Sequence, residues 1–178
     1  MKIALSTDHA GFEALQKLQS FLEEKGYKCI NFGPKSFVPS DDYPDFIRPA
    51  AEAVASGQCE FGIIFGGSGE GEAMAANRIK GVRCGVFYGP ERPVGSINAE
   101  GDQSQDEYEI LRLNRQHNDA NMLSLAGRFM DQATIEKAVM IWLETPFSDE
   151  PRHRRRIEKL DIYYEKAIIC PTILAQTE

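Results

Sequence analysis

A glycine-rich stretch between an apolar run and a helix-forming run constrains the fold of this chain more than any other feature. Residues 61–65 (Phe-Gly-Ile-Ile-Phe) are a short apolar run, which is typical of a strand buried on both faces. Residues 72–78 are good helix formers without a breaker. Four glycines occupy the six positions between these runs, beside the hydroxyl of Ser68 and the carboxylates of Glu70 and Glu72.

Glycine lets the backbone turn tightly and approach a ligand. We therefore expect the amides of this loop to form an anion-binding site at the start of a helix. An ordinary strand-to-helix turn is the alternative. Carboxylates at the mouth of such a loop are unusual for a purely structural turn, and they favour a proton-transfer site.

Strands and helices alternate along the rest of the chain, which predicts a parallel sheet covered by helices on both faces. In that architecture ligands bind beyond the carboxyl ends of the strands. Asp8-His9, the glycine loop and the segment after the fourth strand should therefore face one crevice. Besides the central strand, we expect strands at 2–7, 28–32, 83–87 and 122–125, and helices at 12–25, 43–56, 134–143 and from Pro151 to about 165.

Length, charge and cysteine content exclude several classes of protein. A chain of 178 residues has room for one domain, which we expect over 1–165, with a tail over 166–178. The net charge of −7 argues against a general nucleic-acid partner. No apolar stretch approaches ~20 residues, and a strand is expected directly at the start, so neither a membrane span nor a signal peptide is expected. The four cysteines show no zinc spacing, which predicts reduced thiols in a cytoplasmic protein.

The run from Gly89 to Gln105 is polar, rich in turn residues and longer than the usual connection between a strand and a helix. It is either an exposed excursion or a lid over the crevice.

Two groups of residues outside the glycine loop could also carry chemistry. His9 and His117 lie at expected strand–loop junctions, which we place on the ligand side of the sheet; structural hydrogen bonding is the alternative. Arg152, Arg155 and Arg156 would share one face of a helix, where two guanidinium groups could grip a phosphate. A solvated basic face is the alternative for these arginines.

Seven pieces of the sequence resemble, in the same order, the sugar-phosphate isomerases that include ribose-5-phosphate isomerase type B and galactose-6-phosphate isomerase. Each piece is weak alone, whereas together they extend from Lys2 to about Tyr164. The pieces are Ser6-Thr7-Asp8-His9-Ala10-Gly11, Asp42-Tyr43-Pro44, residues 66–72, Ala75-Ala76-Asn77-Arg78, Gln116-His117-Asn118, Gly127-Arg128, and Arg152-His153 with Arg156.

This resemblance implies a Rossmann-like three-layer αβα fold with a five-stranded parallel sheet and a C-terminal helix. It implies an aldose–ketose isomerase of a phosphorylated sugar that needs no metal or other cofactor. It also implies a homodimer, or a tetramer, whose sites are shared between subunits.

The resemblance also suggests a role for each matched residue. His117 would help to open the cyclic sugar with assistance from Asp8, while Ser68 and the glycine-loop amides would hold the enediolate oxygens. The matched loop positions are Gly67, Gly69 and Gly71; the positions around the phosphate are His9, Arg128, Arg152 and Arg156; those lining the sugar are Tyr43 and Asn118. A base, a hole lined by donors and a cationic clamp are what proton transfer between adjacent carbons of a phosphosugar requires.

The chain departs from this family in two places. Gly66 stands where many members carry a catalytic cysteine, and Glu72 stands where another branch carries a glutamate, so we expect Glu72 to be the base and Glu70 to lie at the rim. A carboxylate near a helix N-terminus is favoured in its charged form, which would keep this base ready. The long run 89–105 is the second departure, and it leaves ribose 5-phosphate and a six-carbon analogue open as substrates.

Two other functions compete with an active isomerase. A catalytically silent sugar-phosphate-binding subunit of a hetero-oligomeric isomerase is the first, although the presence of Asp8, Glu72 and His117 together argues against silence. A nucleotide-binding Rossmann protein fits less well, because the glycines follow the third strand and lack the dinucleotide spacing.

Overall fold

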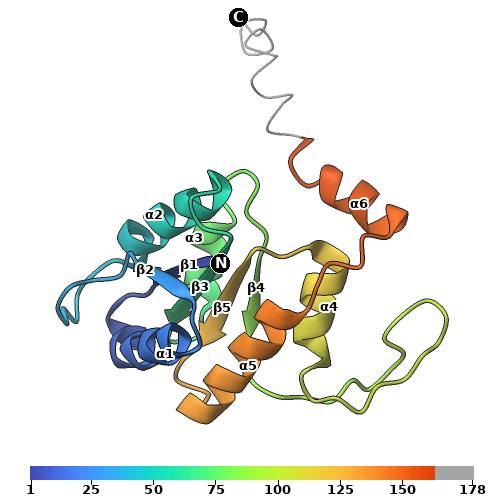
Figure 1. The fold of residues 1–178 in the computed structure, drawn as a ribbon, viewed down its shortest axis with the longest axis horizontal. Helices are drawn as coiled ribbons and strands as arrows, with labels where there is room; N and C mark the ends of the chain where they lie inside the picture. Colours follow the sequence, from blue (N-terminus) through green and yellow to red (C-terminus); the bar gives the residue numbers. More distant parts are fainter. Residues whose placement is uncertain (163–178) are drawn as a thin grey trace, which may run out of the picture.

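The computed structural model describes residues 1–162, and they contain a parallel sheet of five strands in the order β2-β1-β3-β5-β4 (Figure 1). The chain moves outward from β1 to β2 and then crosses to β3 on the other side of β1. The ends of β1 and β3 therefore flank the point where the strand order reverses, which is where ligands bind in open parallel sheets. The strands are β1 (Lys2–Ser6), β2 (Lys28–Asn31), β3 (Phe61–Gly66), β4 (Cys84–Phe87) and β5 (Met122–Ala126).

Helices cover both faces of the sheet and bury a separate apolar cluster on each face. The larger cluster joins Leu15 and Leu18 of one helix to Trp142 of another across the sheet residues Ile63 and Leu123. The smaller cluster joins Ile47 and neighbouring alanines to the opposite side of the same strands. The helices are α1 (Phe12–Glu24), α2 (Tyr43–Ala55), α3 (Glu70–Ala76), α4 (Glu109–Asn118), α5 (Gln132–Glu144) and α6 (Pro151–Glu158), and a short 3₁₀ turn, η1, covers His9–Gly11.

Local signals explain several helix ends. Gly26 follows α1 with a φ of 88°, a left-handed conformation that glycine adopts without strain. Pro44 lies in the first turn of α2, where its missing amide costs nothing. The side chain of Asp131 caps α5 by accepting a hydrogen bond from the Thr134 amide at 2.8 Å.

The predicted αβα fold with a five-stranded parallel sheet is confirmed, and the five strands agree with the sequence prediction within about one residue at each end. Helix α4 was not predicted from the sequence. The last helix was predicted to continue to about residue 165, whereas α6 ends at Glu158. The extent of the domain to residue 165 stays a prediction, and the expected tail over 166–178 lies outside the described residues.

The connection between β4 and α4, residues 88–108, is a long irregular loop that extends away from the sheet (Figure 1). Its two arms meet where the Glu91 amide donates to the Glu107 carbonyl at 2.8 Å. Its tip is closed by a hydrogen bond from the Ile97 amide to the Asp102 carbonyl at 2.9 Å. Among the helices of residues 1–162, none has the length and apolar character needed to cross a membrane.

Candidate active site

The glycine loop, residues 67–69, follows β3 and is fastened to the neighbouring strand. The Gly127 amide donates to the Gly66 carbonyl at 3.0 Å, and the Ser124 hydroxyl donates to the Gly69 carbonyl at 2.6 Å. Gly69 has a φ of 77°, which favours glycine and turns the chain into α3. These bonds hold the loop at the carboxyl end of the sheet.

Three successive amides of this loop are free to bind a ligand. Within the described part of the chain, the amides of Gly67, Ser68 and Gly69 donate to no hydrogen-bond acceptor. The exposed Ser68 hydroxyl accepts a long hydrogen bond of 3.4 Å from the Glu70 amide. Unpaired amides beside a helix start are suited to a negatively charged oxygen.

The Glu72 side chain is buried beneath this loop, with 5% of its surface exposed. Its carboxylate fills the space that a side chain at Gly66 would need, because a Cβ built there would lie 2.0–2.2 Å from the carboxylate atoms. Glu70, two residues earlier, is only partly buried, so the two carboxylates differ as expected.

The pKa of Glu72 is raised above its ordinary value. Burial is the main cause, and the charge of Asp8 adds to it, whereas a backbone hydrogen bond and His9 act in the opposite direction. The expectation that the helix start would favour the charged form was therefore wrong in its net direction, because desolvation outweighs it.

Asp8 and His9 follow β1 and belong to the same crevice as Glu72. The Asp8 carboxylate accepts a hydrogen bond from the Ala10 amide at 2.8 Å. The His9 Nδ1 lies 2.7 Å from the Asp41 carboxylate and 3.6 Å from that of Asp8. The sequence analysis missed Asp41, although it directly precedes the Asp42-Tyr43-Pro44 motif.

These three side chains are also the group in residues 1–162 whose spacing could hold a metal ion, with ligand atoms within 4.8 Å of one another. The contact between His9 and Asp41 accounts for one of the carboxylate oxygens, whereas Asp41 Oδ2 is buried and has no partner in the described part of the chain. The prediction that no metal is needed stays a prediction.

Two further predicted residues lie against the glycine loop and the first turn of α3. The ring of Tyr43 packs against Gly71, so closely that a Cβ there would approach it to 2.8 Å. The guanidinium group of Arg128 lies over Gly67, about 3.2 Å from the corresponding Cβ position. The glycines therefore admit both side chains to the rim of the crevice.

The other predicted residues form a second cluster on α4 and α6. His117 stacks on His153, with ring centroids 4.3 Å apart and an angle of 11° between the rings. His153 is buried, and its Nδ1 has no hydrogen-bond partner among residues 1–162. Arg152 Nε lies 2.8 Å from the Glu150 carboxylate, while Arg156 is exposed.

The environment of His117 is cationic. Burial, His153, Arg152 and Arg156 all lower its pKa, and Glu150 alone opposes them. The ring is therefore neutral at pH 7, which is the form that accepts a proton. His153 was quoted in the sequence motif but was given no role there, and its burial is what identifies it here.

The two clusters lie at opposite ends of the sheet. Glu72 follows the carboxyl end of β3, whereas His117 precedes the amino end of β5, and the two strands are parallel and in register from Gly62–Met122 to Gly66–Ala126. Four residues of strand span roughly 13 Å. The expected placement of His117 on the ligand side of the sheet was therefore wrong, since the undetected helix α4 carries it to the other end.

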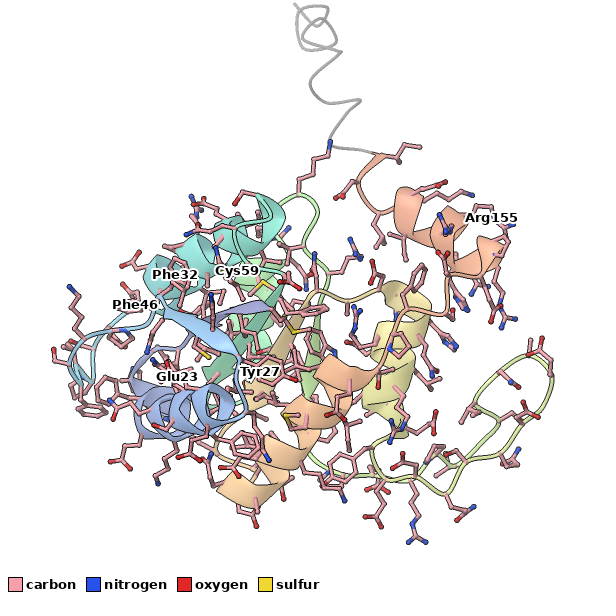
Figure 2. The ribbon with its side chains drawn as sticks, in the orientation of Figure 1. Glu23, Tyr27, Phe32, Phe46, Cys59 and Arg155 are labelled. Atoms are coloured by element: carbon pink, nitrogen blue, oxygen red, sulfur yellow. The ribbon has the colours of Figure 1, made fainter. Side chains whose placement is uncertain are left out.

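Figures 1 and 2 show this separation. The arrows of β4 and β5 point away from α6, which lies beyond their starting ends. Arg155 on α6 lies across the molecule from Phe46, whose carbonyl accepts a hydrogen bond from Ser6 at the end of β1 (Figure 2). β4 is the edge strand, and the segment after it packs beside Ile110 and Leu113 of α4, so the expectation that this segment faces the crevice stays a prediction.

The thiols of the described residues are poor candidates for a base. Burial raises the pKa of Cys29 to about 11, and it also raises the pKa of Cys59 and Cys84. Thiolates would therefore be scarce at neutral pH.

Comparison with known proteins adds independent information. The family model described as Ribose/Galactose Isomerase matches residues 3–93 and 104–160. The chain is 35% identical over 173 residues to ribose-5-phosphate isomerase B of Mycolicibacterium paratuberculosis, a match that covers 97% of each chain.

Solved structures agree with these matches. A ribose 5-phosphate isomerase of Thermotoga maritima has a TM-score of 0.76 at 35% identity, with 90% of this chain and 97% of that chain covered. Ribose-5-phosphate isomerase B of Mycoplasma genitalium, solved with bound ribulose-5-phosphate, has a TM-score of 0.77 at 32% identity, with 93% and 96% covered.

Proposed function

This chain belongs to the ribose/galactose isomerase family, and on that premise we propose that it interconverts ribose 5-phosphate and ribulose 5-phosphate with Glu72 as the base. Aldose–ketose isomerisation of a phosphorylated sugar is the activity of its relatives. The observation that carries the choice of base is the fit between Gly66 and the buried Glu72 carboxylate.

The cluster around the glycine loop, at the carboxyl end of the sheet, contains the groups needed for proton transfer between adjacent carbons. Glu72 removes a proton from one carbon and returns it to the next. The free amides of Gly67, Ser68 and Gly69 stabilise the enediolate oxygen while the charge is on the substrate. The raised pKa of Glu72 favours this exchange, because a carboxylate that holds a proton more firmly is a stronger base.

The second cluster, on α4 and α6, supplies ring opening and phosphate binding. A neutral His117 accepts or returns the proton of the sugar hydroxyl during ring opening, together with Asp8. Arg152 and Arg156 bind the phosphate, and guanidinium groups suit this task because each offers several donors to its oxygens. Arg128 and His9 approach the phosphate from the glycine-loop side, and Tyr43 and Asn118 line the sugar.

One protomer does not bring these two clusters together, so the proposal requires a second copy. We propose a homodimer in which the glycine loop of one protomer faces α4 and α6 of its partner. A symmetric dimer then forms two identical sites, each made from both copies. A tetramer of such dimers would preserve the same sites.

Turnover of the purified protein with ribose 5-phosphate and with galactose 6-phosphate tests the substrate. We expect ribose 5-phosphate to give the higher kcat/KM, since the isomerases named above act on the pentose. Preference for the hexose would replace the substrate but keep the mechanism. Binding without turnover of either sugar would instead support a silent subunit.

A further inference from the structure

The tip of the long loop between β4 and α4 lies outside the family model. The family model matches residues up to 93 and from 104 onward, so residues 94–103 have no counterpart in it. This insertion has its own internal structure, because the Asn98 side chain donates to the Asp102 carboxylate at 2.7 Å and accepts from the Asp102 amide at 3.0 Å.

The insertion brings a carboxylate to the arginine cluster. Glu100 Oε1 lies 3.5 Å from Arg152 Nη1, although the two residues are 52 positions apart in sequence. Arg152 Nε is already paired with Glu150 at 2.8 Å. Glu100 therefore contacts one of the two terminal nitrogens, which are the remaining donors of Arg152 for a phosphate.

We propose that Glu100 competes with the substrate phosphate for Arg152 and so sets how tightly the site binds phosphorylated substrates. This proposal rests on the proposed role of Arg152 as a phosphate ligand. The carboxylate holds the arginine while the site is empty, and the phosphate of a substrate must displace it. A sugar without a phosphate makes no use of Arg152, so the competition lowers the affinity for phosphorylated sugars alone.

The size of the effect follows from the exposure of the pair. The Glu100 side chain is 62% exposed and that of Arg152 is 31% exposed, so the ion pair is weak and sensitive to salt. A competitor of this strength should weaken phosphate binding about two- to sixfold at low ionic strength.

Glu100→Gln tests the proposal by removing the charge while keeping the shape. We expect the Kd for inorganic phosphate and the KM for ribose 5-phosphate to fall about two- to sixfold, and the difference to disappear in high salt. Glu107→Gln is the matched control, since Glu107 lies on the same loop and pairs with Arg92, not Arg152, at 3.2 Å. An equal response in both variants, or none in Glu100→Gln, would overturn the competition.

Arg152→Ala separates this proposal from the proposed function. If Arg152→Ala weakens phosphate binding but Glu100→Gln has no effect, the arginine binds phosphate and the competition alone is wrong. If Arg152→Ala leaves phosphate binding unchanged, the phosphate site itself is misplaced. When both proposals hold, Glu100→Gln has no further effect on phosphate affinity in an Arg152→Ala background.

Discussion

The two clusters of the proposed site differ in how they are built. The glycine-loop cluster is buried: Glu72 and Asp8 are almost inaccessible, and hydrogen bonds from Gly127 and Ser124 fix the loop above them. The second cluster, on α4 and α6, is more accessible to solvent: Arg152 is partly exposed, and Arg156 is exposed on the short helix α6. Proton transfer benefits from a fixed environment without water, whereas binding of a charged substrate from solution benefits from exposed charges that attract it. Each cluster is therefore suited to a different step of one reaction.

The largest expected effect comes from the buried cluster. Glu72→Gln keeps the shape of the side chain and removes the base, so kcat should fall by ~10²–10⁴ while substrate binding persists. Steady-state kinetics together with a binding measurement, for example titration calorimetry with a substrate analogue, would check both parts.

Glu70→Gln is the control for that variant. Glu70 precedes Glu72 by two residues on the same helix but is not buried beneath the loop, so its loss should change kcat little. A Glu70→Gln protein that binds substrate but does not turn over would show that the wrong carboxylate was chosen.

The next effect tests whether the two clusters meet between protomers. Glu72→Gln and His117→Asn should each be nearly inactive as homodimers. Their mixed dimer has one intact site out of two, so it should regain about half of the wild-type activity. Co-expression with two different affinity tags would isolate it. Activity no higher than that of the parents would argue against a shared site.

A smaller effect is expected in the open cluster. Arg152→Ala or Arg156→Ala should each remove a charge-assisted contact with the phosphate, which costs ~1.5–3 kcal/mol and raises KM roughly ten- to a hundredfold. Arg154 is the internal control, because it pairs with Asp149 and lies on an exposed side of α6. Equal, small effects at all three positions would leave only a solvated basic face.

The smallest effect concerns the pH dependence of kcat/KM. The pKa of Glu72 is raised above 4.5, so its basic form is lost as the pH falls through that higher value. The pKa of His117 is lowered below 6.5, so this ring keeps its neutral form at pH 7. We expect activity to fall on acidification and to be level above neutral pH. A thiol base would instead add a rise at alkaline pH, because burial raises the pKa of Cys29, Cys59 and Cys84.

The fold and the first cluster could be predicted from the sequence because their signals are local. Alternating apolar runs identified the strands, and the glycines before Glu72 identified the loop. Helix α4 was missed because most of its residues are polar and only a few form its apolar face. One of these is Leu111, which packs into the core. Without α4, the position of His117 at the opposite end of the sheet could not be anticipated. The contact between Glu100 and Arg152 depends on the path of an irregular loop, which no local pattern encodes.

The fit of the Glu72 carboxylate into the space beside Gly66 restricts how this enzyme can evolve. A side chain at position 66 would take the space that this carboxylate now fills, so Glu72 would have to turn out of the site to admit one. A lineage that exchanges one base for the other therefore passes through a protein with either no base at the site or a glutamate displaced from it. The two positions are therefore expected to be inherited as a pair.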